Sequence, residues 1–344
     1  MSDQPQLTET QMAGQRLMVG FDGPALDDEL KFYIEKLKVG GIILFSRNLE
    51  EPRQMERLCR DAQEYARQCG LPPLFIGIDQ EGGVVSRLKP PFTQFAGNPS
   101  IRTRDDAKVF ARTTAKELAQ IGVNMNMAPV LDVLPGRGDS VMTERSFGRD
   151  PQFVSKMGDI VIDIFQQHRI MAVAKHFPGI GRTVLDSHLD LPDLDIEFDR
   201  LESRDIMPFR SAMTRGVAGI MLSHIRYRSL DPQWPASLST PIADALLRRR
   251  YGYQGLVLTD DLDMGAIANH YQLDQIVSQC LNASVDILLI CHPSQKIEAA
   301  HGLIVDLQYK NEIWNRMTSA AVNRILKMKT DYLSTVQESR RWRE

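Results

Sequence analysis

The chain has 344 residues, of which 43% are hydrophobic and 25% are charged, and its formal net charge at pH 7 is −3. This composition is ordinary for a globular protein, and the length suits one large α/β barrel or two average domains. The slightly acidic balance gives no electrostatic basis for binding nucleic acid or an anionic membrane surface, so we expect neither as a partner.

The chain carries no recognisable targeting or membrane signal. Residues 1–11 are polar and lack a basic start and an apolar stretch, and no apolar run approaches the roughly 20 residues of a membrane span. The four cysteines have no CxxC spacing, which favours reduced thiols and a cytoplasmic location. We expect a flexible start over residues 1–10, one domain over residues 11–335 and a charged tail over residues 336–344.

Apolar strand-like runs alternate with helical patterns along most of the chain. Strands are predicted over residues 41–45, 74–79, 123–127, 172–176, 219–224, 255–260 and 286–291. One predicted helix begins near Arg104 and ends at Gly122, where glycine can close its C-terminus. A second has Thr240 as N-cap and Pro241 at its first position, and a last one contains Ile325, Leu326 and Met328.

These elements predict a single (β/α)8 TIM-type barrel with some irregular strands. Near-continuous apolar strands are typical of a parallel sheet covered on both faces. About eight strand–helix units fit one barrel, for which about 250 residues are typical. A doubly wound sheet is the alternative. The barrel is favoured because its strand ends all face one rim, and several predicted strands end in chemically useful residues: Asp79, His176, His224 and Asp260.

The most informative segment runs from Lys175 to His188. A buried strand delivers Lys175 and His176, and a glycine-containing loop then carries Asp186, Ser187 and His188. A carboxylate two residues before a histidine can orient the imidazole and raise its basicity, which suits proton transfer. Taken alone, a histidine after a strand is more often a core or capping residue, and Asp-Ser-His can be ordinary turn chemistry.

Charged residues near other strand ends could complete such a site. Asp79 precedes residues 80–83, which include two glycines, so its carboxylate could accept hydrogen bonds from sugar hydroxyls or could cap the turn. Arg87 and Arg145 offer forked donors suited to polar ligands, although an exposed arginine is usually only solvated.

Asp260 follows an apolar strand, where a carboxylate without partners would be costly. It is followed by Asp261 and Asp263. An acidic cluster of this kind suggests catalytic use, but it could also bind magnesium, and Asp261 or Asp263 could cap a helix.

Together these segments resemble the bacterial β-N-acetylglucosaminidases of glycoside hydrolase family 3. The similarity covers nearly the whole chain, with ordered matches at residues 40–48, 79–83, 126–133, 144–147, 175–188, 235–239 and 259–262. The resemblance implies that Asp260 is the nucleophile, His188 the general acid/base and Asp186 its orienting partner. It also implies that the sugar is bound by Asp79, Arg87, Arg145, Lys175 and His176.

The chain departs from the family pattern at Ile180, where the family loop commonly has a histidine. That histidine is not the acid/base, so activity is expected to survive, with an effect on loop mobility or substrate preference. The chain also lacks the large second domain of many family 3 β-glucosidases, which favours the single-domain glucosaminidase branch.

The resemblance implies a retaining exo-enzyme that removes N-acetylglucosamine from anhydro-N-acetylmuramic acid, with or without peptide, in cell-wall recycling. We expect no metal or cofactor, and a monomer or weak homodimer. One alternative is a metal-dependent barrel hydrolase using His176, His188, His224 and the acids as ligands. The other is a non-catalytic sugar-binding barrel. The sequence leaves open the aglycone and the use of phosphate in place of water.

Overall fold

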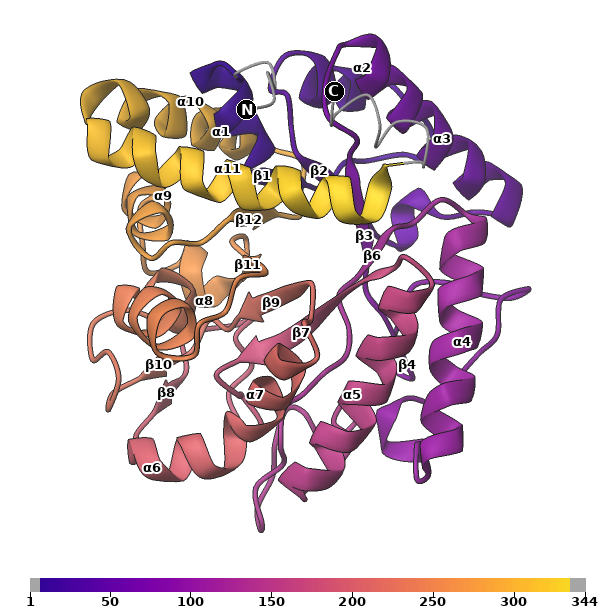
Figure 1. Cartoon of the computed structure of the whole chain (residues 1–344), viewed down its shortest axis with the longest axis vertical. Coiled ribbons are helices and arrows are strands. Elements are labelled where there is room, and N and C mark those ends of the chain that lie inside the picture. The colour runs from indigo at the N-terminus through magenta and orange to yellow at the C-terminus, as the bar shows by residue number, and fades with distance from the viewer. Residues whose placement is uncertain (1–6, 335–344) are drawn as a thin grey trace.

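The computed structural model describes residues 7–334, and within them eight parallel strands form a closed barrel (Figure 1). The strands are β1 (Leu17–Val19), β2 (Gly41–Leu44), β3 (Phe75–Ile78), β6 (Met125–Asn126), β7 (Met171–Phe177), β9 (Gly219–Leu222), β11 (Leu256–Asp261) and β12 (Ile287–Ile290). Strands that follow one another in the chain are neighbours, and β1 closes the circle by pairing with β2 and β12. The barrel prediction is confirmed, and the doubly wound alternative, in which the strand order reverses, is wrong.

Helices cover the outside of the barrel. They are α1 (Glu9–Gln15), α2 (Asp28–Glu35), α3 (Pro52–Gln68), α4 (Arg104–Gln120), α5 (Pro151–Gln167), α6 (Phe198–Arg200), α7 (Met207–Thr214), α8 (Gly265–Ala268), α9 (Leu273–Asn282), α10 (Gln295–Lys310) and α11 (Glu312–Leu333). Short 3₁₀ or π-helical segments are η1 (Ser46–Asn48), η2 (Asn98–Ser100), η3 (Leu201–Asp205), η4 (Ala236–Leu238) and η5 (Pro241–Arg250). Two small sheets pair β4 (Gln80–Gly82) with β5 (Val85–Ser86), and β8 (Asp193–Leu194) with β10 (Arg226–Tyr227).

Two predicted boundaries need correction. Thr240 is not the N-cap of η5, because its backbone is already helical and its side chain makes no capping bond. The oxygen that caps this helix belongs to Ser239, whose Oγ accepts a hydrogen bond from the N–H of Ile242 at 3.2 Å. The expected flexible start over residues 1–10 also overlaps a helix, since Thr8 caps α1 and α1 begins at Glu9.

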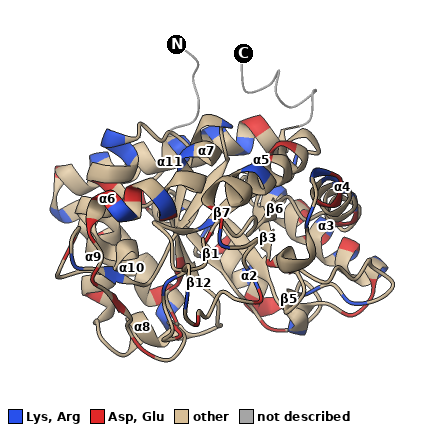
Figure 2. Cartoon of the chain, turned by 90° about the horizontal axis from the view of Figure 1, so that it is seen from below, with Lys and Arg blue, Asp and Glu red and all other residues tan. Residues whose placement is uncertain are grey.

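The first six residues and the predicted charged tail lie outside the described residues. In the part of the chain that the structure covers, no helix has both the length and the apolar character needed to cross a membrane. Figure 2 shows basic and acidic segments close together on helices such as α6, in keeping with the small net charge.

Apolar side chains fill the barrel and also lie between the strands and the helices. The interior cluster is rich in methionine and includes Met18, Phe75, Met127, Met171 and Met221. Ile325 of α11 belongs to the same cluster, so this helix covers the end of the barrel where the strands begin. A barrel filled by side chains is a packed core rather than a pore, which confines ligands to its rim.

A buried lysine at this covered end predicts an unusual pH dependence of stability. The Nζ of Lys329 lies 2.6 Å from Gln15 Oε1 and 5.0 Å from the centre of the Phe75 ring. Burial lowers the pKa of Lys329 to about 7. The unfolded chain keeps its ordinary value of about 10.4, so between these values the unfolded state binds more protons. We therefore expect the free energy of unfolding to rise with pH across this window.

Urea unfolding between pH 7 and pH 9 measures this effect. The slope contributed by Lys329 is expected to approach about 1.4 kcal/mol per pH unit and to vanish in Lys329→Met. Lys327→Met is the matched control, because Lys327 lies on the same helix with its side chain 67% exposed. Parallel stability curves for wild type and Lys329→Met would contradict the prediction.

Candidate active site

The carboxyl ends of the barrel strands surround a cavity of about 270 Å³. β3, β7 and β11 bring their polar C-terminal residues to this rim, because parallel strands in a barrel all end on the same side. The structure brings together all the site residues predicted from the sequence, since the cavity is lined by Asp79, Arg87, Arg145, Lys175, His176, Asp186, His188 and Asp260.

A cluster of ion pairs lies on one side of the cavity. The Nζ of Lys175 lies 2.7 Å from Asp79 Oδ1 and 2.7 Å from Glu81 Oε1. Arg145 binds Glu81 through two N–H groups at 2.7 and 3.0 Å, and Arg87 lies 3.4 Å from Asp79. Burial opposes ionisation of Asp79, but Lys175 and Arg87 outweigh it and lower its pKa to about 2. Asp79 is therefore an ionised acceptor suited to sugar hydroxyls.

Glu81 is a site residue that the sequence analysis missed. Its side chain is 1% exposed, and it joins Lys175 to Arg145. The following glycines, Gly82 and Gly83, have φ values of 82° and 62° and let the chain turn tightly after the acid. The available signal was a second acid two residues after Asp79 in a buried segment, where a carboxylate needs charged partners.

A second missed acid, Asp132, holds His176. Asp132 is fully buried, and its Oδ2 lies 2.7 Å from His176 Nδ1. A carboxylate only accepts hydrogen bonds, so Nδ1 donates, and Nε2 lies 3.4 Å from a guanidinium nitrogen of Arg145. Asp132 also accepts the N–H of Ile180 at 2.8 Å. Ile180 is buried, and through its backbone it ties the start of the loop to the residue that orients His176.

Asp260 lies at the end of β11 with its carboxylate held in the ionised form. Its Oδ1 accepts the N–H of Asp261 at 2.9 Å. Burial alone would raise its pKa, but the neighbouring imidazoles of His176 and His224 outweigh burial and hold the pKa of Asp260 below its usual range. A fixed, ionised carboxylate at the cavity wall has the properties required of a nucleophile.

Asp186 and His188 form a hydrogen-bonded pair on the loop that follows β7. Asp186 Oδ1 lies 2.7 Å from His188 Nδ1 and accepts the N–H of His188 at 2.9 Å. Burial opposes ionisation of Asp186, but these two bonds outweigh it and lower its pKa. Because Nδ1 donates to the carboxylate, Nε2 is the atom of His188 that can exchange a proton with substrate. The His188 side chain is 66% exposed.

The geometry does not favour a metal site built on His176, His188 and His224. His224 uses both ring nitrogens, at 2.7 Å from Ser237 Oγ and 2.9 Å from the carbonyl oxygen of Asp261. The ring nitrogens of His176 are engaged by Asp132 and Arg145 as described above. These hydrogen bonds fix the orientation of both imidazole rings. They would have to break before His176 or His224 could ligate a metal.

The other two acids after Asp260 are held by contacts within the protein, although Asp261 also lines the cavity. Asp261 Oδ1 accepts the backbone N–H groups of Asp263 and Cys291 and so does not cap a helix. Burial, followed by the charge of Asp263, raises the pKa of Asp261 to about 6. Ligand atoms of Asp261, Asp263 and His292 lie within 4.8 Å of one another, but Lys296 Nζ already lies 2.7 Å from Asp263 Oδ1. A cation would have to compete with this ammonium group.

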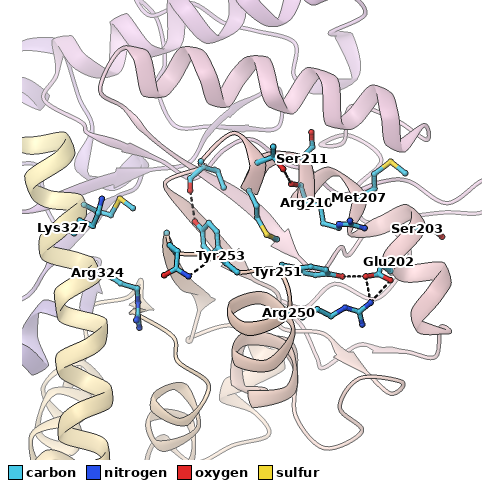
Figure 3. A pocket seen from close by; sticks show the side chains of 18 residues that line it. Glu202, Ser203, Met207, Arg210, Ser211, Arg250, Tyr251, Tyr253, Arg324 and Lys327 are labelled. Carbon is cyan, nitrogen blue, oxygen red and sulfur yellow. Dashed lines mark hydrogen bonds and ion pairs between the residues drawn. The ribbon is translucent and has the colours of Figure 1, made fainter.

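A larger groove of about 1190 Å³ lies at the opposite end of the barrel (Figure 3). Its lining includes segments that immediately precede β9 and β11, and therefore the ends at which these strands begin. Charged groups there have protein partners: Arg250 and Tyr251 each lie 2.8 Å from Glu202, and Arg324 lies 2.8 Å from Asp286. Barrel enzymes carry out chemistry at the other end, so the smaller cavity is the candidate active site.

Comparison with known proteins identifies the family of this site. The model described as the glycosyl hydrolase family 3 N terminal domain matches residues 7–328. Beta-hexosaminidase A of Pseudoalteromonas piscicida is 33% identical over 94% of this chain, which spans only 61% of that longer protein. The beta-hexosaminidase of Alkalilimnicola ehrlichii is 36% identical over 82% of each chain.

Among solved structures, a family 3 beta-N-acetylglucosaminidase from Paenibacillus sp. str. FPU-7 is similar with a TM-score of 0.92. It is 33% identical in sequence, and the match covers 98% of this chain and 68% of that one. The family resemblance predicted from the motifs is confirmed.

Proposed function

The chain belongs to glycosyl hydrolase family 3 and is a β-N-acetylhexosaminidase of that family, and we propose that it is a retaining exo-enzyme acting on peptidoglycan fragments. One observation carries the mechanism. The ionised Asp260 and the Asp186–His188 pair line one cavity, beside a cluster of charged groups suited to a polar ring.

In the first step the Asp260 carboxylate attacks the anomeric carbon, and Nε2–H of His188 gives its proton to the departing glycosidic oxygen. The glycosidic C–O bond breaks, and a glycosyl ester on Asp260 forms. In the second step Nε2 of His188 takes a proton from water, whose oxygen displaces Asp260 from the same carbon. Two inversions retain the β configuration. An imidazole titrates near neutral pH and does not need the raised pKa that a carboxylic acid requires for this task.

The residues around the cavity support binding of one terminal sugar. Asp79 would accept hydrogen bonds from hydroxyl groups, and Arg87, Arg145 and Lys175 would donate to hydroxyl oxygens or the acetamido carbonyl. His176, whose Nε2 is left as an acceptor, would accept from a hydroxyl group. Met221, Met264 and Leu289 also line the cavity and offer apolar contacts to a sugar face or an acetamido methyl. A volume of about 270 Å³ is small for a ligand site, which favours an exo-acting enzyme that removes one sugar at a time.

We propose that the aglycone is anhydro-N-acetylmuramic acid, with or without peptide. A cavity that holds only the terminal N-acetylglucosamine leaves a variable aglycone outside it. All four cysteines are free thiols, which suits a reducing cytoplasm where imported wall fragments would be salvaged. One chain supplies every residue of the proposed site, so that activity would not require an oligomer. We propose that the protein is a monomer or weak homodimer.

Chromogenic glycosides test the sugar preference. We expect nitrophenyl N-acetyl-β-glucosaminide to be hydrolysed with a kcat/KM about 100-fold or more above that of the matching β-glucoside, because donors placed for an acetamido group lose their partner with glucose. Purified muropeptides, with the products identified by mass spectrometry, test the aglycone. Release of internal oligosaccharides, or a preference for the glucoside, would overturn the proposal.

A further inference from the structure

The loop that carries the acid/base pair rests on the helix that follows the nucleophile. α8 begins five residues after Asp260. Its first backbone N–H groups donate to the loop, Gly265 to the carbonyl of His188 at 3.1 Å and Ala266 to the carbonyl of Ser187 at 3.0 Å. The first N–H groups of a helix have no partner within the helix, so these two donors are satisfied by the loop itself.

The approach of the loop to α8 is close enough to require glycine. A Cβ at Gly265 would lie 2.5 Å from the carbonyl oxygen of Leu189 and 2.7 Å from that of His188. Both are backbone atoms, so a side chain could be accommodated only by displacing the loop. The need for glycine arises from this contact and not from a left-handed backbone, since Gly265 is regular α-helix.

A side-chain pair fastens the same loop just beyond the dyad. His270 follows α8, and its Nε2 lies 2.5 Å from Asp190 Oδ1. The pair is partly exposed, with 39% of the His270 side chain and 59% of the Asp190 side chain accessible. We call Asp190–His270 the clasp.

Between residues 184 and 189, few apolar side chains of the loop are buried in the protein core. Val184 and Leu189 are each 70% exposed, and the side chains of Asp186 and His188 are 49% and 66% exposed. A segment whose side chains stay outside the core is positioned by the few polar contacts that it makes. From Ser187 to Asp190 those contacts lead to α8 and the clasp, which follow Asp260 in the chain.

We propose that α8 and the clasp hold the acid/base loop over the cavity, so that Gly265, Asp190 and His270 are positioning residues for His188. This inference rests on the acid/base role proposed above for His188. The segment from Asp260 through α8 to His270 then sets the distance between the nucleophile and the proton donor. Displacing the loop impairs proton donation while leaving sugar binding by Asp79, Lys175 and Arg145 intact.

Gly265→Ala tests the docking of the loop. We expect kcat for substrates with poor leaving groups to fall about 100-fold, the effect of misplacing a catalytic group by about 1 Å, with KM nearly unchanged. Dinitrophenyl glycosides, which need little proton donation, should lose far less in the glycosylation step. Gly302→Ala is the matched control, because Gly302 lies inside α10 and a Cβ there would meet nothing within 4 Å.

Variants of the clasp give an independent test that involves no backbone clash. Asp190→Ala and His270→Ala are each expected to lower kcat for poor leaving groups about 2- to 5-fold, as for an exposed ion pair. The double variant should lose no more than either single one, because both remove the same interaction. His270→Gln, which keeps a donor near the position of Nε2, should recover most of the loss. Asp331→Ala, which removes an exposed ion pair with Lys327 on α11, is the control.

The results separate this proposal from the mechanism on which it rests. If His188→Ala changes the dependence on leaving group but Gly265→Ala and the clasp variants keep the wild-type dependence, the positioning role is wrong and the mechanism stands. If His188→Ala itself leaves that dependence unchanged, the acid/base assignment fails first. If thermal unfolding shows that Gly265→Ala folds poorly, the clasp variants still test the proposal. A double variant whose loss of kcat equals the combined losses of the two single variants would overturn it.

Discussion

Asp260→Asn is expected to remove nearly all glycosidase turnover, with kcat reduced on the order of 10⁴-fold or more, as for loss of a nucleophile in other covalent mechanisms. The amide cannot form the glycosyl ester, although it retains the shape and an acceptor for the N–H of Asp261. The fold should survive, because the substitution changes neither the shape of the side chain nor its hydrogen bond with the backbone. Steady-state kinetics on a nitrophenyl N-acetyl-β-glucosaminide measure the loss, and thermal unfolding checks the fold.

Asp263→Asn is the matched control for this experiment. Asp263 lies three residues further along and pairs with Lys296 rather than lining the cavity. Its amide variant should keep activity within a few-fold of wild type. A mechanism-based fluorosugar should label Asp260 in the wild-type enzyme. Labelling of Asp261 or Asp263 instead would transfer the nucleophile to a different carboxylate and contradict the assignment.

The sequence predicted most barrel strands because strands buried on both faces are continuous apolar runs. β1 was not among them. Its three residues follow Arg16, a residue that is 1% exposed and would ordinarily mark a surface position. The charge of Arg16 is accommodated by Thr318 and the carbonyl of Val285, which lie far along the chain. No local pattern could reveal partners at that separation.

Active-site residues could be predicted where they stand at strand ends or in a motif that carries its own chemistry. Glu81 and Asp132 were missed because their roles depend on partners from other segments. Glu81 meets Arg145 across 64 residues of sequence, and Asp132 meets His176 across 44. The contact that holds the acid/base loop could not be predicted for the same reason, since Asp190 and His270 are 80 residues apart in the sequence. The packing of the barrel decides such pairings, and residue type alone does not.

His188→Ala should slow both chemical steps, by about 10²- to 10⁴-fold for substrates whose leaving group needs a proton. The first step should be affected least with dinitrophenyl glycosides, because a stable leaving anion departs without protonation. The second step does not depend on the leaving group, because the attacking water must be deprotonated in every case. Its rate should therefore fall for all substrates. With dinitrophenyl substrates we therefore expect a burst of released phenol followed by slow turnover, as the glycosyl ester on Asp260 accumulates.

Stopped-flow absorbance measures the burst, and a series of phenyl glycosides measures the dependence of kcat/KM on leaving-group acidity. His292→Ala is the matched control, because its side chain is 67% exposed, against 66% for His188, and contacts Asp261 and Asp263 without forming part of the dyad. It should retain the wild-type dependence. A His188→Ala enzyme with that same dependence and no burst would assign proton transfer to another group. Asp186 would then no longer have the role of orienting the acid/base through its bond to His188 Nδ1.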